Sequence, residues 1–136
     1  MLRIAITCGE GFTSGFVARR LQELVKKEHL EDVANFRVIP YYELKERQNE
    51  VDIAMLLPQI EPKAQMEQNE FSIPMYVIPF KAITRVKAQA FIEDAEDILA
   101  LAKGKKGIQQ FPNETQHVLV NRSVSHRAYE ASRMHG

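Results

Sequence analysis

Hydrophobic positions in the first half of the chain fall into short apolar runs that alternate with segments of helical periodicity. Leu2–Thr7 is such an apolar run and ends at Cys8. Over residues 16 to 29, apolar side chains recur every three or four positions with charged side chains between them. The first pattern is typical of a buried strand and the second of an amphipathic helix. The chain is therefore predicted to begin with a strand and a helix, with Thr13 or Ser14 as the helix cap.

The same alternation continues along the chain. It predicts three further strands at Phe36–Ile39, Val51–Leu57 and Ile73–Ile78, and three further helices at Tyr42–Arg47, Pro62–Asn69 and Ala88–Lys103. Strands that alternate with helices form parallel sheets, because parallel neighbours need a crossover between them. The expected fold is α/β: a three-layer sandwich with a four-stranded parallel sheet, helices on both faces, and a phosphate loop after the first strand. Cys8 then lies at the carboxyl end of a strand, where such sheets bind ligands.

The pattern weakens after Gly104. A polar joint, Lys105-Lys106-Gly107, leads into residues 109–136, which are mostly polar apart from the short apolar run Val118–Val120. We therefore predict a single domain over residues 1–104 and an appended tail over residues 105–136, which is either flexible or forms a strand or short helix. Arg122 in this tail is expected to be solvated. So is the charged face of the last predicted helix, which carries Glu93, Asp94, Glu96 and Asp97.

Composition narrows the function classes. The chain has 18 basic and 18 acidic residues, so no global field attracts it to nucleic acid or to an anionic membrane. No apolar stretch is long enough to cross a bilayer, and the first apolar run is too short for a signal peptide. We expect a cytoplasmic protein with no nucleic-acid partner and no direct membrane insertion. His117, His126 and His135 recur at equal spacing, but nothing brings them together, so no metal site is predicted.

Cys8 is the single cysteine, and a glycine-rich turn follows it. A lone cysteine at a strand end commonly just fills core space. Here, however, Gly9 and Gly11 leave room for an anion, and the predicted helix start supplies N–H groups and a partial positive charge. A thiol near a helix N-terminus ionises more easily and becomes a better nucleophile. We therefore predict that Cys8 accepts a phosphoryl group, whose oxygens the surrounding residues bind: Gly9, Glu10, Gly11, Phe12, Thr13, Ser14 and Gly15.

At these residues the sequence resembles the IIB component of the lactose/cellobiose class of the bacterial sugar phosphotransferase system. Cys8–Ser14 is similar to the family's C-x-x-G-x-[ST]-[ST] motif at the end of the first strand. Weaker similarities follow in the family's order, at Val38–Leu44, Leu56–Ile60 and Ile73–Ile78. The resemblance covers about residues 1 to 103.

The resemblance implies a transferase of the protein-phosphocysteine–sugar phosphotransferase type that serves sugar transport. Cys8 would accept the phosphoryl group from a phosphohistidine of the IIA partner and pass it to a sugar held by the membrane permease IIC. No metal or organic cofactor would be needed, because the loop stabilises the charge. Gly9 and Glu10 depart from the family's serine and small neutral residue, and Leu57 replaces a glycine. Pro79–Thr84 also does not match the family's segment after the fourth strand. Glu10 and this mismatched loop leave open a diverged regulatory domain that binds an anion or a partner without catalysis.

Low-molecular-weight tyrosine phosphatases and arsenate reductases share the layout of strand, cysteine loop and helix. Such phosphatases need C-x5-R, because the arginine holds the phosphate through two parallel hydrogen bonds. Counted from Cys8, that position holds Ser14. Arsenate reductases use further cysteines, which this chain lacks. A phosphatase-like enzyme is therefore the less favoured alternative.

Overall fold

The computed structural model describes residues 1–9, 12–112 and 114–135, and its core is one parallel sheet. The strands are β1 (Leu2–Thr7), β2 (Ala34–Val38), β3 (Ile53–Leu56), β4 (Pro74–Val77) and β5 (Gly107–Ile108). Their order is β2-β1-β3-β4-β5, and every pairing is parallel. The predicted α/β class is confirmed, but the described sheet has five strands and not four. The two residues of β5 are too few to produce a periodic pattern.

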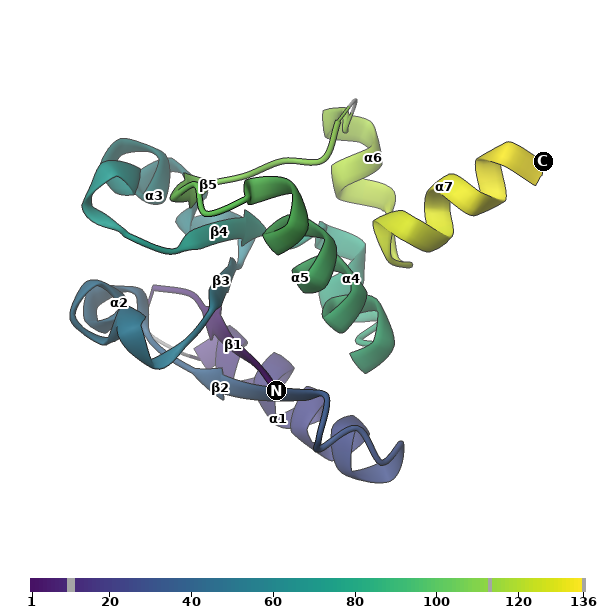
Figure 1. The fold of residues 1–136 in the computed structure, drawn as a ribbon, viewed down its shortest axis with the longest axis horizontal. Coiled ribbons are helices and arrows are strands. Elements are labelled where there is room, and N and C mark those ends of the chain that lie inside the picture. The colour runs from purple at the N-terminus through teal and green to yellow at the C-terminus, as the bar shows by residue number, and fades with distance from the viewer. Residues whose placement is uncertain (10–11, 113, 136) are drawn as a thin grey trace.

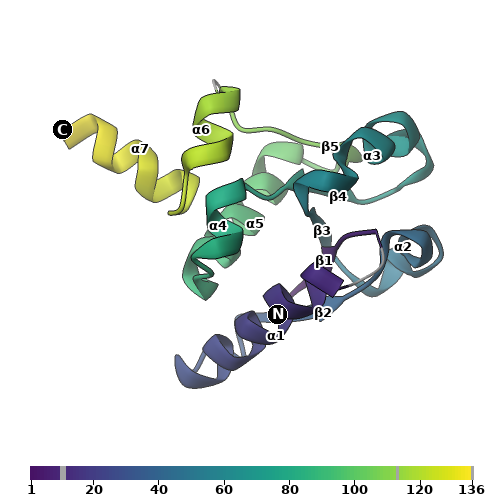
Figure 2. The same ribbon diagram turned by 180° about the vertical axis from the view of Figure 1, so that it is seen from behind.

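Helices cover both faces of this sheet, as Figures 1 and 2 show. The helices α1 (Phe12–Lys27), α4 (Phe80–Thr84) and α5 (Ala88–Ala102) pack on one face, and α2 (Tyr41–Arg47) and α3 (Glu61–Glu67) pack on the other. Ile4 and Ile6 of β1 belong to the first core, and Ala5 belongs to the second. This alternation follows from the two-residue period of a strand. Continuous apolar runs are needed here because both faces are buried.

Two helices differ from the sequence prediction near the carboxyl ends of the strands. The helix α1 begins at Phe12, so Thr13 and Ser14 lie inside its first turn and the prediction that either one caps it is wrong. The helix α4 was not predicted, because five residues give too little periodicity. Pro79 precedes it with a φ of −58°, an angle that suits a helix start.

The C-terminal segment, defined as residues 107–135, adds β5, α6 (Gln116–Asn121) and α7 (His126–His135). The helix α6 packs against α4, and α7 packs against α5 and extends away from the sheet (Figure 1). At Gly107 the backbone has a φ of 87°, which favours glycine. Within the described residues, no helix combines the length and hydropathy that a bilayer-spanning helix requires.

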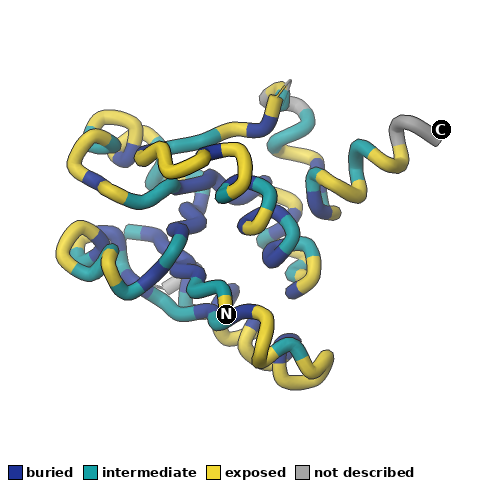
Figure 3. Tube along the Cα trace, viewed as in Figure 1, coloured by how far each residue is buried: buried dark blue, intermediate teal, exposed yellow. Residues whose placement is uncertain are grey.

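Arg122 lies between α6 and α7 and is buried, which corrects the expectation that it is solvated. Figure 3 shows that buried positions concentrate along the strands of the sheet and on the helices packed against them. Its Nη1 donates to both carboxylate oxygens of Asp94 on α5, at 3.2 and 2.9 Å. Its Nη2 donates to Glu114 at 3.1 Å and to the hydroxyl of Tyr76. We call Arg122, Asp94, Glu114 and Tyr76 the Arg122 cluster. Asp94 is therefore buried as well, and it does not belong to the solvated face predicted for its helix.

Candidate functional site

Cys8 lies at the carboxyl end of β1, between the ends of β2 and β3. The chain leaves β1 for α1 on one face of the sheet, and it leaves β3 for α3 on the opposite face. Connections that diverge in this way open a crevice between two neighbouring strand ends, and parallel α/β proteins place their ligands there. Cys8 therefore occupies the position in this sheet where a ligand is expected.

The thiol of Cys8 contacts the first turn of α1. Its Sγ lies 3.1 Å from Oγ of Ser14, within hydrogen-bond reach. Both residues are buried, with 3% of the surface of Cys8 and 0% of that of Ser14 exposed. The first four N–H groups of an α-helix have no acceptor within the helix, so this end attracts negative charge. The arrangement places a nucleophilic atom beside a hydroxyl and a helix N-terminus.

Other residues of the predicted phosphate loop are described only in part. Thr13 is exposed on the first turn of α1, and Gly9 and Gly15 are half-buried. Phe12 is the first residue of α1. Glu10 and Gly11 lie outside the described residues. The structure thus brings Ser14 to Cys8, and it leaves the rest of the predicted loop as a prediction.

Backbone hydrogen bonds hold Cys8 and the residue before it from both sides. The carbonyl of Cys8 accepts from the N–H of Tyr41 at 2.8 Å, and the carbonyl of Thr7 accepts from the N–H of Leu57 at 2.8 Å. Tyr41 is anchored in turn, because its hydroxyl donates to Glu67 at 2.6 Å. Burial, together with the carboxylate of Glu67, raises the pKa of Tyr41 well above its ordinary value, so the hydroxyl stays a neutral donor. The end of β1 is therefore fixed by the segments that follow both neighbouring strands.

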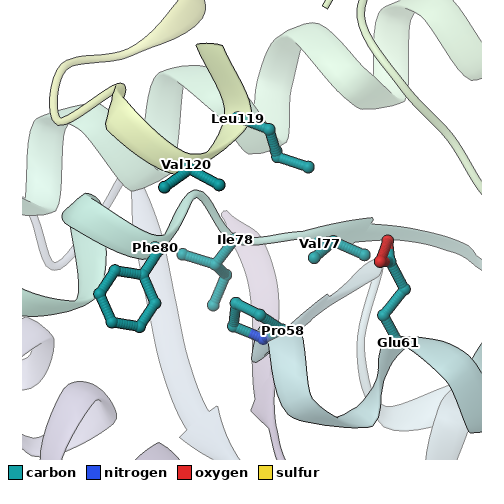
Figure 4. Close-up of a pocket in the computed structure, with 7 residues that line it drawn as sticks. All are labelled: Pro58, Glu61, Val77, Ile78, Phe80, Leu119 and Val120. Atoms are coloured by element: carbon teal, nitrogen blue, oxygen red, sulfur yellow. The ribbon is translucent and has the colours of Figure 1, made fainter. Parts of the chain in front are cut away.

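An apolar pocket of about 330 Å³ lies at the carboxyl ends of β3 and β4. Its lining residues are Pro58, Glu61, Val77, Ile78, Phe80, Leu119 and Val120. Leu119 and Val120 of α6 lie across the pocket from the strand ends, while Phe80 and Glu61 stand at its two sides (Figure 4). Sequence reasoning missed this pocket. Its one signal was the short apolar run that contains Leu119 and Val120 within an otherwise polar segment.

A sequence model of the family "PTS system, Lactose/Cellobiose specific IIB subunit" matches residues 3–94. The chain belongs to this family. It is accordingly a sugar phosphotransfer component of the phosphotransferase system, with a phosphotransferase role in sugar transport, and the family generally works with IIA and IIC partners. The resemblance found in the sequence is confirmed. Among curated proteins, none matches the chain.

The family match includes Cys8, Ser14 and the carboxyl ends of β1 to β4, but it stops at Asp94. The helices α6 and α7 both lie beyond the match. Arg122 also lies beyond it and binds the last matched residue. The apolar pocket therefore combines strand ends of the family domain with a wall from outside it.

Proposed function

We propose that this IIB protein is a phosphoryl carrier whose acceptor atom is Sγ of Cys8. In the first step Sγ attacks the phosphorus of a phosphohistidine on the IIA partner. The S–P bond forms while the N–P bond breaks, and the released imidazole takes up the proton that the thiol gives up. In the second step a hydroxyl oxygen of a sugar held by IIC attacks the same phosphorus. The S–P bond breaks, the thiolate leaves, and the hydroxyl proton passes to the thiolate or to solvent.

The observation that carries this proposal is the contact between Cys8 and Ser14 at the N-terminal turn of α1. A phosphoryl group on Sγ would extend into the region where a helix start offers N–H groups and a hydroxyl. Donors that are already oriented toward developing negative charge stabilise the transition state without reorganisation. We propose that residues Gly9 to Gly15 surround the phosphoryl group, and that the carrier works in the cytoplasm without a metal or organic cofactor.

Label transfer tests the proposal. The full chain is incubated with IIA proteins of the lactose/cellobiose class that carry a radiolabelled phosphohistidine. We expect label on the wild-type chain and none on Cys8→Ser, with mass spectrometry at neutral pH locating the added mass on Cys8. Label that persists in Cys8→Ser would contradict the assignment of the acceptor.

A second candidate is a regulatory domain that binds an anion or a partner and has lost the transfer step. The burial of Cys8 favours this candidate, because a phosphoryl donor must reach the sulfur. Complete absence of label with every IIA protein, although a complex forms, would support it.

A further inference from the structure

The apolar pocket lies beside Cys8 at the same edge of the sheet. Thr7 pairs with Leu56, and Leu56 pairs with Val77, so Ile78 stands about level with Cys8 two strands away. Neighbouring strands lie about 4.8 Å apart, which places Ile78 on the order of 10 Å from Cys8. A protein that delivers a phosphoryl group to Cys8 would therefore cover this pocket as well.

The wall of the pocket formed by α6 is held firmly in place. Arg122 follows α6 directly, and its side chain is fully buried among Asp94, Glu114 and Tyr76. The backbone N–H of Arg122 also donates to the carbonyl of Val118 at 2.9 Å. A helix of only six residues has little stability of its own, so this anchor fixes the position of Leu119 and Val120.

The lining identifies the chemistry of the occupant. Apart from Glu61, every side chain of the pocket is apolar, and Phe80 and Val120 are exposed to solvent. A sugar would leave most of its hydroxyl groups without partners there, which is costly. An aliphatic or aromatic side chain of a protein gains by the burial of its surface in such a pocket. The pocket is therefore suited to a side chain and not to the sugar.

Glu61 adds a charge preference at the side of the pocket. Its carboxylate makes neither a hydrogen bond nor an ion pair with the residues that the structure describes, and it lines a second, more polar hollow together with Gln109 and Gln110. A lysine or arginine next to the inserted side chain would meet this carboxylate. Charge complementarity at the rim of an interface mainly sets the choice of partner and the association rate.

We propose that the C-terminal segment makes this pocket a recognition site for the IIA phosphoryl donor. The donor inserts one apolar side chain between α6 and the strand ends, and an adjacent basic residue pairs with Glu61. The proposal rests on the proposed function, because it needs phosphoryl transfer between a IIA protein and Cys8. It assigns the choice of donor to residues 119 and 120, outside the family match.

Steady-state label transfer from a IIA protein tests this inference in the full chain. Val120→Asp places a carboxylate on the apolar wall, and we expect the KM for the donor to rise by about tenfold or more while kcat changes little, as for a central interface residue. Glu61→Lys should raise the same KM, with a smaller effect at high salt. Leu101→Asp is the matched control. Leu101 is also an exposed apolar residue, and it lies in the last turn of α5, near the amino ends of the strands and away from the pocket.

The outcomes separate the two proposals. Wild-type chain that takes no label from any IIA protein overturns the proposed function, and this inference with it. Wild-type chain that takes label, with Val120→Asp and Glu61→Lys no different from Leu101→Asp, overturns this inference alone. Normal uptake with impaired delivery to the sugar would assign the pocket to IIC and would also overturn it. Equal alkylation rates of Cys8 in all variants check that the thiol itself is undisturbed.

Discussion

At the scale of single residues, the short distance between Cys8 and Ser14 matters most. A serine near a helix start commonly accepts a backbone N–H as a cap, which is why the sequence predicts that role. Here Ser14 lies within the first turn, and its hydroxyl faces the thiol instead. The motif identified the residues that gather at Cys8, but the direction of one hydroxyl depends on where the helix begins.

Replacing Ser14 with alanine should slow the phosphorylation of Cys8 and leave the fold intact. The variant removes the hydroxyl 3.1 Å from Sγ, and the loss of one oriented donor costs roughly a hundred- to a thousandfold in rate. Alanine is a good helix former, so α1 should persist. The rate of label transfer and a thermal unfolding curve measure the two effects. Ser132→Ala removes an exposed hydroxyl on α7, outside the predicted phosphate loop, and should transfer at the wild-type rate; a Ser14→Ala protein as fast as this control would contradict the role of the hydroxyl.

At the scale of elements, the sequence predicts the strands and helices whose apolar side chains recur with a clear period. It misses elements that are too short to show such a period. The prediction for β1 matches its observed bounds, and α5 differs by one residue at its end. Both are long enough for their apolar pattern to be recognised. In contrast, β5 has two residues and α4 has five. Their existence depends on contacts with β4 and α6, distant in sequence, and local pattern cannot report such contacts.

An ion pair joins the start of β1 to the residue before β3 and should make stability depend on pH. Asp52 accepts from the backbone N–H of Arg3 at 2.8 Å and from its guanidinium at 3.0 Å. Partial burial alone would raise the pKa of Asp52, but these interactions outweigh it and hold the pKa below the ordinary value of 3.8. The ionised carboxylate is therefore favoured by folding. This contribution is present above about pH 4 and is lost as the pH falls through the lower, folded-state pKa.

Asp52→Asn should consequently lower the free energy of unfolding at pH 7 by less than about 1 kcal/mol, since both side chains are partly exposed. Its difference from wild type should shrink as the pH falls below about 4. Urea unfolding at a series of pH values measures this. Asp32→Asn, an exposed acid without an ion pair among the described residues, should show neither effect. A difference for Asp52→Asn that stays constant with pH would contradict the sign argued here.

At the scale of the whole molecule, the Arg122 cluster joins the C-terminal segment to the family domain. Arginine is almost never fully buried unless it is paired. The polar composition of the C-terminal segment, which includes Arg122, therefore made the segment look like a solvated tail. Two carboxylates, of Asp94 and Glu114, supply the pairing from separate parts of the chain. Sequence pattern cannot find such a cluster, because each member alone looks like a surface residue.

Removing Arg122 should therefore destabilise the protein far more than removing a neighbouring arginine. Arg122→Met leaves two buried carboxylates without a cation, which costs about 3–5 kcal/mol. Burial raises the pKa of Asp94 to about 6 even with Arg122 present. Without the cation, protonation of the Asp94 carboxylate at low pH reduces the cost of burying its charge. The destabilisation should thus be larger at pH 8 than at pH 5. Arg127→Met is the matched control, because Arg127 pairs with Asp97 on the same helix α5 but is half exposed, and its loss should cost under about 1 kcal/mol. Urea unfolding that gave equal losses for the two variants would mean that the cluster does not anchor the segment.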